Sequence, residues 1–326
     1  MTGRIVAITF VTLAPALAQL PGRPDDSIPA QADAIYEKGL RYLARTQTAK
    51  GTWDDGTGSE PGVVGLCVAS FLAHGDDPAG EHAKVIRKGI DYILAEQNKS
   101  NGYIGDGMYS HGFATKALAE SYGVVDHPGI AVALKKAVDL IVSAQKRNNF
   151  GAWRYGPDSK DADSSVTGAQ LVALYAARNA GLAVPEESIR KGLAYLNNNR
   201  GADGGYGYTN SSGGKPTLTA VGVLCLSLAK QRDSKGYKNS LEYLKKNFDY
   251  RDRYYPFYYE YYMSQALFHA DEESWREWNS RNIRYLAAIQ NPDGSFPGDF
   301  HGTAFSTAGA LLSLAVNYRY LPIFEK

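Results

Sequence analysis

Residues 47–53 read Gln-Thr-Ala-Lys-Gly-Thr-Trp, and this stretch decides the fold because it recurs along the chain. Gln47 follows the pair Tyr42-Leu43, and Gly51 and Trp53 come after it at fixed spacing. Related copies start at intervals of 42 to 55 residues, at Tyr42, Tyr92, Leu140, Tyr195, Tyr243 and Tyr285. Self-similarity at such a period is typical of a repeat architecture rather than of unrelated domains.

Each copy ends a run in which apolar residues fall at helical spacing and charges occupy the other face. In the first copy, Tyr36, Leu40 and Leu43 are interspersed with Glu37 and Arg41, which predicts an outer helix. A turn and a far less charged run follow each copy. These six runs are residues 62–73, 112–122, 165–177, 217–228, 261–268 and 303–314. A helix with so little charge must be buried on every side, so the runs predict inner helices.

Six such pairs predict an all-α fold, an (α/α)6 toroid of six helix pairs in a single domain over residues 31–326. The alternative arrangement is an open superhelical stack. An open stack would leave the concave face of the second helices in water, and such faces usually carry more charge than these six runs do. We therefore expect a closed ring.

The first 18 residues predict a signal peptide. Arg4 precedes the apolar run of residues 5–13, and the segment ends in Ala16-Leu17-Ala18. The apolar run is too short for a permanent membrane anchor, and the small residues at its end suit a signal peptidase. We therefore expect an exported protein, periplasmic or secreted, with a Pro-rich leader at residues 19–30 and no transmembrane segment.

The charge and the cysteine count exclude two classes of protein. Removal of residues 1–18 would take away Arg4 and no acid, leaving 34 basic and 34 acidic residues. Such a chain lacks the basic stripe that neutralises phosphates, so no nucleic-acid partner is expected. Cys67 and Cys225 are too few for a disulfide scaffold, and both fall inside apolar runs, where we expect core residues.

The motif Gln-x-x-x-Gly-x-aromatic is complete in two of the six copies and looser in two more. The four are Gln47 with Gly51 and Trp53, Gln290 with Gly294 and Phe296, Gln97 with Gly102 and Tyr103, and Gln145 with Gly151 and Trp153. Together with the helix pairs, this pattern resembles the squalene-hopene cyclase and prenyltransferase repeat superfamily of terpenoid-cyclase toroids, over about residues 31–322. The resemblance implies that the Gln and the aromatic residue tie each outer helix to its neighbour.

The cyclases of this superfamily carry an Asp-x-Asp-Asp motif at the head of an inner helix, and its central Asp protonates an alkene. This chain has Asp161-Ala162-Asp163-Ser164 at the head of its third inner run. The resemblance implies catalytic roles for Asp163, in the protonating place, and for Asp161, while Ser164 stands where a second acid would be. Asp is also a preferred N-cap residue, so capping is a second and compatible role for Asp163.

The prenyltransferase branch of the superfamily implies a zinc ion held by Asp, Cys and His. Cys67 and Cys225 lie in the middle of inner runs, and Gly302 stands about where the ligand His would fall, one residue after His301. We therefore predict no metal and no cofactor.

In a closed ring, the turns before the inner helices gather at one end, and these turns are rich in aromatic residues. We predict that the ligand-binding residues are Trp53, Tyr103, His111, Trp153, Tyr206, Tyr208, Tyr255, Tyr258, Asp299 and His301. Aromatic faces stabilise a carbocation by about 0.5 to 2 kcal/mol each. Tyrosine and tryptophan also stack on sugar rings and offer hydrogen bonds, so the lining leaves two ligand classes open.

The leading functional hypothesis is a squalene-cyclase-like protein that binds an apolar, isoprenoid-like molecule or lipid in a central aromatic cavity. Acid-initiated cyclisation or isomerisation by Asp163 would be its reaction. Ser164 and the single toroid leave open a non-catalytic binding or scaffold module with the same fold. A third hypothesis is a carbohydrate-active toroid that binds a glycan, which needs two acids at a suitable separation, such as Asp106 and Asp299.

Overall fold

The computed structural model describes residues 28–75, 77–298 and 300–324. These residues form twelve α-helices and two short 3-10 helices, and within them the only strand-like pairings are isolated bridges. The all-α class predicted from the sequence is confirmed. The predicted signal peptide at residues 1–18 and most of the leader at 19–30 lie outside the described residues.

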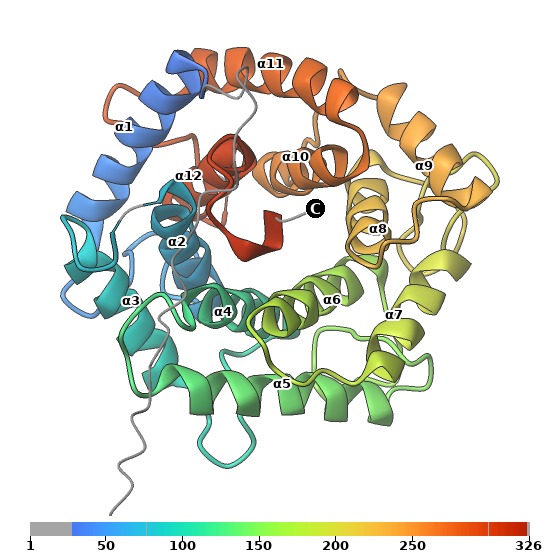
Figure 1. The fold of residues 1–326 in the computed structure, drawn as a ribbon, viewed down its shortest axis with the longest axis horizontal. Coiled ribbons are helices and arrows are strands. Elements are labelled where there is room, and N and C mark those ends of the chain that lie inside the picture. The colour runs from blue at the N-terminus through green and yellow to red at the C-terminus, as the bar shows by residue number, and fades with distance from the viewer. Residues whose placement is uncertain (1–27, 76, 299, 325–326) are drawn as a thin grey trace, which may run out of the picture.

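The helices alternate between an outer and an inner ring, and the chain runs once around (Figure 1). The outer helices are α1 (Ala30–Thr46), α3 (Ala83–Glu96), α5 (Ile130–Arg147), α7 (Glu186–Asn198), α9 (Lys235–Lys245) and α11 (Glu272–Ile289). The inner helices are α2 (Pro61–His74), α4 (Met108–Ser121), α6 (Ser164–Asn179), α8 (Pro216–Leu228), α10 (Pro256–Ala270) and α12 (Thr303–Leu314). Contacts of α12 with α2, and of α1 with α11, close the ring as expected.

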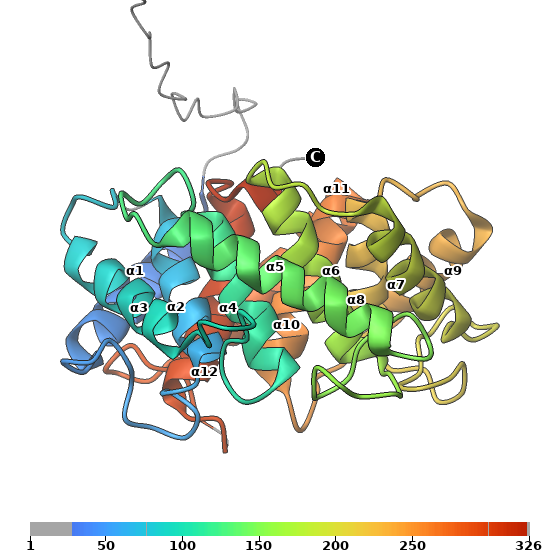
Figure 2. The same ribbon diagram turned by 90° about the horizontal axis from the view of Figure 1, so that it is seen from below.

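The two ends of the toroid differ. The turns from outer to inner helices gather on one edge, the lower edge in Figure 2, so the inner helices all begin there. We call this edge the mouth. The C-terminal helices η1 (Ala315–Asn317) and η2 (Pro322–Phe324) lie toward the opposite edge, where η1 packs on α2, α10 and α12, and η2 packs on α6.

Two inner helices begin earlier than the hydrophobic pattern predicts. Pro256 occupies the first turn of α10, where its fixed φ favours a helix start and its missing N–H is not needed. Tyr258 therefore lies inside a helix rather than in a turn. The first turn of α4 likewise contains Tyr109 and His111. In both cases, polar aromatic residues at the helix head conceal the boundary in the sequence.

In four of the six repeats, the Gln links an outer helix to the next one. Its Nε2 donates both to the carbonyl of the Gly in its own motif and to a carbonyl of the following outer helix. These bonds join Gln47 to Gly51 and Val85, Gln97 to Gly102 and Ala133, Gln145 to Gly151 and Ser188, and Gln290 to Gly294 and Ile35. For the Gln, this geometry shows the structural role that the resemblance implies.

We expect Gln290→Leu to lower the free energy of unfolding by about 2 kcal/mol, because two carbonyls lose their donor. Nε2 of Gln290 donates to Ile35 and to Gly294 at 3.0 Å each, which joins the last repeat to the first. Urea denaturation measures the loss. The matched control is Gln231→Leu, at an exposed residue between α8 and α9, and a similar loss in both variants would contradict the prediction.

Candidate functional site at the mouth

The mouth holds a buried carboxyl group, Asp163, which is the N-cap of α6 and is 0 % exposed. Its Oδ1 accepts hydrogen bonds from the backbone N–H groups of Ser165 and Val166, at 2.9 and 2.8 Å. The Ser165 hydroxyl also donates to Oδ1, at 2.7 Å. Oδ2 has no hydrogen-bond partner among the described residues. The predicted capping role is confirmed, and it uses only one of the two oxygens.

A guanidinium group faces the second oxygen. Nε of Arg154 lies 3.9 Å from Oδ2 of Asp163, and Nη1 lies 3.2 Å from Oδ2 of Asp161. The guanidinium carbon stands 5.1 and 5.5 Å from the ring centroids of Tyr155 and Tyr208, whose hydroxyls hydrogen-bond to each other. Burial raises the pKa of Asp163, and this effect outweighs the opposing hydrogen bonds and the charge of Arg154.

The other polar residues of the acid motif have different surroundings. The Asp161 side chain is 64 % exposed. Oγ of Ser164 donates to the carbonyl of Gly207 at 2.8 Å and accepts from Nδ2 of Asn199 at 2.9 Å, so Ser164 fastens α6 to the turn after α7. Asp163 is therefore the buried acid of this motif.

Tyr109 reaches Asp163 through Ser165. Its hydroxyl donates to Oγ of Ser165 at 2.5 Å, and that hydroxyl in turn donates to Asp163. Tyr109 comes from α4, which packs beside α6 in the inner ring. Its ring centroid lies 6.2 Å from that of Tyr155 and 6.4 Å from that of Tyr258. We name these residues the mouth cluster: Tyr109, Arg154, Tyr155, Asp163, Ser165, Tyr208 and Tyr258.

Aromatic rings of α4 and α10 meet across the axis of the toroid, although these helices lie on opposite sides of the inner ring (Figure 1). The Phe113 ring is 6.5 Å from Tyr258 and 6.2 Å from Tyr261. Tyr262 packs 4.7 Å from Tyr258 on the same helix. The sequence predicts an aromatic cavity here. The structure shows the aromatic residues, and their rings meet across the axis in edge contacts beneath the mouth cluster, while Phe113 and Tyr258 are only partly buried.

Three of the predicted ligand-binding residues lie in the wall between helices. The indole N–H of Trp53 donates to the carbonyl of Leu43 at 3.1 Å, and that of Trp153 donates to Ile141 at 2.8 Å. Both indoles are 2 % exposed, and Tyr206 is fully buried. These contacts belong to the repeat and place the three side chains in packing positions.

His111 is also held on both sides by backbone groups. Nδ1 accepts from the N–H of Ile104 and Nε2 donates to the carbonyl of Ala137, each at 3.1 Å. Burial lowers the pKa of His111 to about 4, so the imidazole is neutral at neutral pH. The Tyr103 ring packs 5.5 Å away. The structure thus places His111 and Tyr103 in a structural contact between α4 and its preceding turn.

The remaining predicted residues divide between the mouth cluster and the far side of the mouth. Tyr208 and Tyr258 belong to the mouth cluster. Tyr255 is exposed, and its ring centroid lies 5.9 Å from that of His301, so these two meet between the last two repeats. Asp299 lies outside the described residues, so the proposed pairing of Asp106 with Asp299 stays a hypothesis.

Arg154 and Ser165 were not predicted from the sequence as site residues. Arg154 stands between two aromatic residues in the turn before the acid motif, and a cation in an aromatic turn is the signal that points to it. Ser165 follows the motif directly, where a hydroxyl in the first turn of a helix can reach its own N-cap. Only their short distances to Asp163 in the structure identify Arg154 and Ser165 as site residues.

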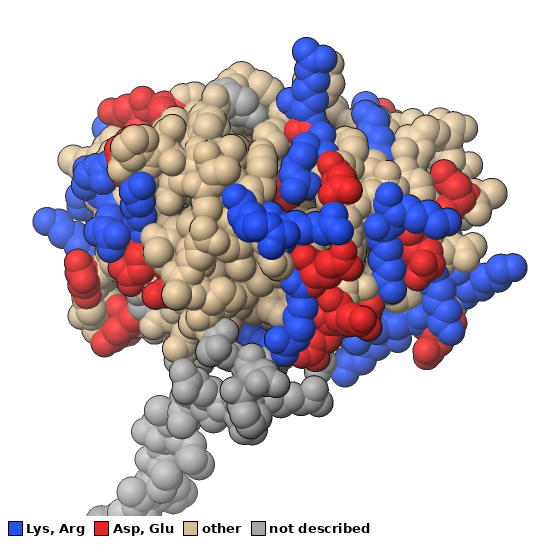
Figure 3. Space-filling model, turned by 90° about the horizontal axis from the view of Figure 1, so that it is seen from above, with Lys and Arg blue, Asp and Glu red and all other residues tan. Residues whose placement is uncertain are grey.

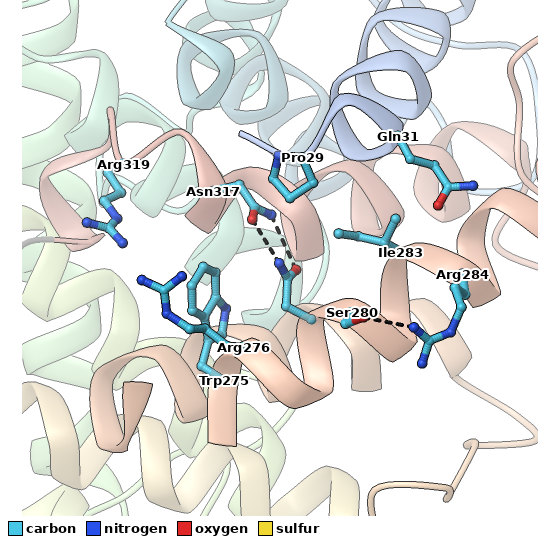
Figure 4. A pocket seen from close by; sticks show the side chains of 10 residues that line it. Pro29, Gln31, Trp275, Arg276, Ser280, Ile283, Arg284, Asn317 and Arg319 are labelled. Atoms are coloured by element: carbon cyan, nitrogen blue, oxygen red, sulfur yellow. Dashed lines mark hydrogen bonds between the residues drawn. The ribbon is translucent and has the colours of Figure 1, made fainter. Parts of the chain in front are cut away.

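A groove of about 440 Å³ opens toward the opposite end, between the start of α1, α11 and the segment after α12 (Figure 4). It is lined by Pro29, Gln31, Trp275, Arg276, Asn279, Ser280, Ile283, Arg284, Asn317 and Arg319. Arg276 pairs with Glu272 at 3.0 Å, and Arg319 stacks on Phe268. The groove is separate from the mouth cluster in residues and in position.

The described residues offer neither a metal-binding cluster nor a helix that could span a membrane. No group of three or more His, Cys, Asp or Glu residues that could hold a metal ion occurs among them. None of their helices is both long and apolar enough to cross a membrane. On the face shown in Figure 3, basic and acidic side chains are interspersed rather than separated into one-sign patches.

Comparison with solved structures agrees with the architecture. The chain is similar to the type II terpene cyclase MstE from Scytonema, in a variant bound to geranylgeranyl dihydroxybenzoate, with TM-score 0.62 and 15 % identity over 90 % of this chain and 98 % of that one. It is also similar to the α-1,6-mannanase GH76A of Salegentibacter sp. HEL1_6, with TM-score 0.66 and 10 % identity over 87 % and 98 % of the two chains. No family model and no curated protein matches the sequence. Similarity at this level of identity shows the α/α toroid fold, which terpene cyclases and a glycoside hydrolase share.

Proposed function

We propose that this protein is exported and binds an apolar, isoprenoid-like molecule at its mouth cluster, where Asp163 transfers a proton to an alkene. One observation carries the proposal. Asp163 is fully buried, three donors hold its Oδ1, and its Oδ2 has no hydrogen-bond partner among the described residues. A buried carboxyl oxygen left in this state is suited to hold and release a proton.

The surroundings of Asp163 support a proton donor. Burial favours the neutral carboxylic acid, which is the form that can donate. Asp163 also lies near enough to Tyr109, Tyr208 and Tyr258 to raise the pKa of each, after burial as the main cause. Aromatic rings beside the acid stabilise a nearby carbocation by about 0.5 to 2 kcal/mol each. The terpene cyclase of the same fold acts on an isoprenoid, which agrees with this ligand class.

We expect Asp163→Asn to remove product formation while the protein still folds, because Asn is as good an N-cap as Asp but has no proton to donate. The mature chain is incubated with total lipid extract from a hopanoid-producing and a hopanoid-free bacterium, and retained and altered molecules are identified by mass spectrometry.

Asp163→Ala is the matched control for the cap, and its loss of the bonds to Oδ1 should lower the free energy of unfolding by about 1 kcal/mol. The Asp163→Asn variant keeps an oxygen that can accept those bonds, so its melting temperature should match or exceed that of the parent. Unchanged product formation by the Asp163→Asn variant would exclude the catalytic role.

A glycan ligand is the second candidate, and exposed aromatic residues favour it. Tyr155, Tyr254, Tyr255 and Phe300 are exposed large side chains in the outer-to-inner turns, where they could stack on sugar rings. The mannanase with this fold binds α-1,6-mannotriose in one of its structures. Calorimetric titration with α-1,6-mannotriose distinguishes the candidates, because binding of the trisaccharide without any retained lipid supports the glycan. Binding of neither leaves a scaffold module.

A further inference from the structure

The two oxygens of Asp163 have separate surroundings. Oδ2 faces Arg154 at 3.9 Å and has no hydrogen-bond partner among the residues described. Oδ1 is the end of a chain of hydroxyl groups, in which Tyr109 donates to Ser165 at 2.5 Å and Ser165 donates to Oδ1 at 2.7 Å. The chain is directional, because each hydroxyl gives its hydrogen toward the carboxylate. Protons can therefore move from Tyr109 to Asp163 along it.

The outer end of this chain lies among the rings where a ligand would bind. The ring of Tyr109 packs near the rings of both Tyr155 and Tyr258. Deeper along the axis, Phe113 packs against Tyr258 and Tyr261. A ligand at the mouth cluster would meet the acid and the hydroxyl chain together, and the contacts of Phe113 across the axis limit how deep a long folded polyprene could extend.

From this arrangement we propose that Tyr109 is a catalytic base, and that Ser165 returns the proton it collects to Asp163, so that the mouth cluster shifts a double bond or closes a single ring. This inference rests on the proposed function and deepens it. It assigns a reaction class, alkene isomerisation or monocyclisation, in place of cyclisation through several rings. It also assigns a catalytic role to Tyr109 and a positioning role to Ser165.

The proton balance closes without a co-reactant. The alkene π electrons take the proton from Oδ2 of Asp163, which leaves a carbocation and a carboxylate. In monocyclisation, the π electrons of a second alkene of the same substrate first form a C–C bond to the cation, which moves the positive charge to the other carbon of that alkene; isomerisation omits this step. A C–H bond next to the cation then breaks, and its electrons form the new double bond. That proton goes to the Tyr109 oxygen as Tyr109 gives its own to Ser165 and Ser165 gives its own to Oδ1. The product is an isomer of the substrate, Asp163 is neutral again, and exchange with solvent between turnovers returns the proton to Oδ2.

The test uses the purified chain with geranylgeraniol and with squalene, in D2O, and mass spectrometry of the products. The parent protein should give an isomer of the substrate that carries solvent deuterium. Tyr109→Phe and Ser165→Ala should form product at least about 100-fold more slowly. They should also shift the products toward alcohols, because water then captures the cation. A merely structural role for Tyr109 would lower the rate without changing the product ratio.

Tyr243→Phe is the matched control, since its hydroxyl donates to the carbonyl of Gly214 at 2.9 Å, away from Asp163. Parent-like rate and products in Tyr109→Phe would overturn the inference and leave the proposed function standing. A product with several rings from the parent protein would also overturn it. If the parent converts neither polyprene and alters no molecule of the lipid extract, the proposed function fails and this inference fails with it.

Discussion

Replacing Gly51 with alanine is expected to lower the free energy of unfolding by about 3 kcal/mol or more. Gly51 has φ +89°, and a left-handed conformation costs an L-residue about 1–2 kcal/mol. A Cβ at this position would lie 2.3 Å from the carbonyl oxygen of Lys88, in the backbone of α3. That oxygen cannot move aside without separating the turn from the helix, and such overpacking typically costs about 1–3 kcal/mol more.

The control for Gly51 is Gly213→Ala. Gly213 also has positive φ, +66°, but a Cβ there meets no atom within 4 Å. Only the conformational cost of about 1 kcal/mol applies. Urea denaturation of both variants separates the close approach from the backbone conformation, and equal losses would show that the contact with Lys88 is unimportant. Gly294 should behave like Gly51, because its Cβ would lie 2.2 Å from the carbonyl oxygen of Lys38 in α1.

The second large effect is expected from Glu260, whose ionisation is opposed by the fold. Glu260 lies on α10, is 0 % exposed, and neither of its carboxylate oxygens has a hydrogen-bond partner among the described residues. Nε of Arg251 lies 3.5 Å from Oε1, but Arg251 is partly exposed and also stacks on Tyr285. Burial outweighs the attraction to Arg251 and raises the pKa of Glu260 to about 8.

This pKa gives the stability a definite dependence on pH. The unfolded chain has a Glu pKa of about 4.3, so the folded state holds a proton that the unfolded state releases. The stabilising contribution is fully present below about pH 4 and is lost as the pH rises toward 8. The free energy of unfolding should fall by up to about 1.4 kcal/mol per pH unit across this window, from this group.

Glu260→Gln should remove that dependence, because the amide cannot ionise. The variant and the parent should have similar stability near pH 4.5, and the variant should be more stable by roughly 3 to 5 kcal/mol at pH 8. Urea denaturation at a series of pH values measures the difference. Exposed Glu242→Gln, on α9, is the matched control, and a Glu260→Gln advantage that is constant with pH would contradict the prediction.

The fold could be predicted from the sequence because the repeats use the same residue types for the same backbone contacts. Gln47, Gly51 and Trp53 each make a close contact with the backbone, so the same residue types recur after four of the six outer helices. The starts of inner helices were harder to predict where the first turn of the helix consists of aromatic residues. Helix α10 begins at Pro256, within a run of tyrosines. The hydrophobic pattern of such a run does not show where the turn ends and the helix begins.

Only part of the candidate site could be predicted from the sequence. Asp163 could be predicted because it matches the acid motif of the family that the chain resembles and because Asp is a preferred N-cap residue. The contacts of Phe113 with Tyr258 and Tyr261 could not be predicted, because they depend on the diameter of the inner ring and on which faces of α4 and α10 point to its axis. The hydrogen bond that connects Tyr109 to Asp163 through Ser165 could not be predicted either, because it depends on how α4 packs against α6.

The bond from Gln290 to Ile35 has a consequence for the way the molecule comes apart. In an open solenoid, the terminal repeats have one neighbour and fray first. Here the last repeat holds the first by the same bond that joins repeats elsewhere, so every repeat has a neighbour on both sides. Breaking one interface leaves the ring held by the others, and releasing any one repeat requires two interfaces to open together. Local openings should therefore be rare, and slow amide-hydrogen exchange should extend with similar protection around the whole inner ring.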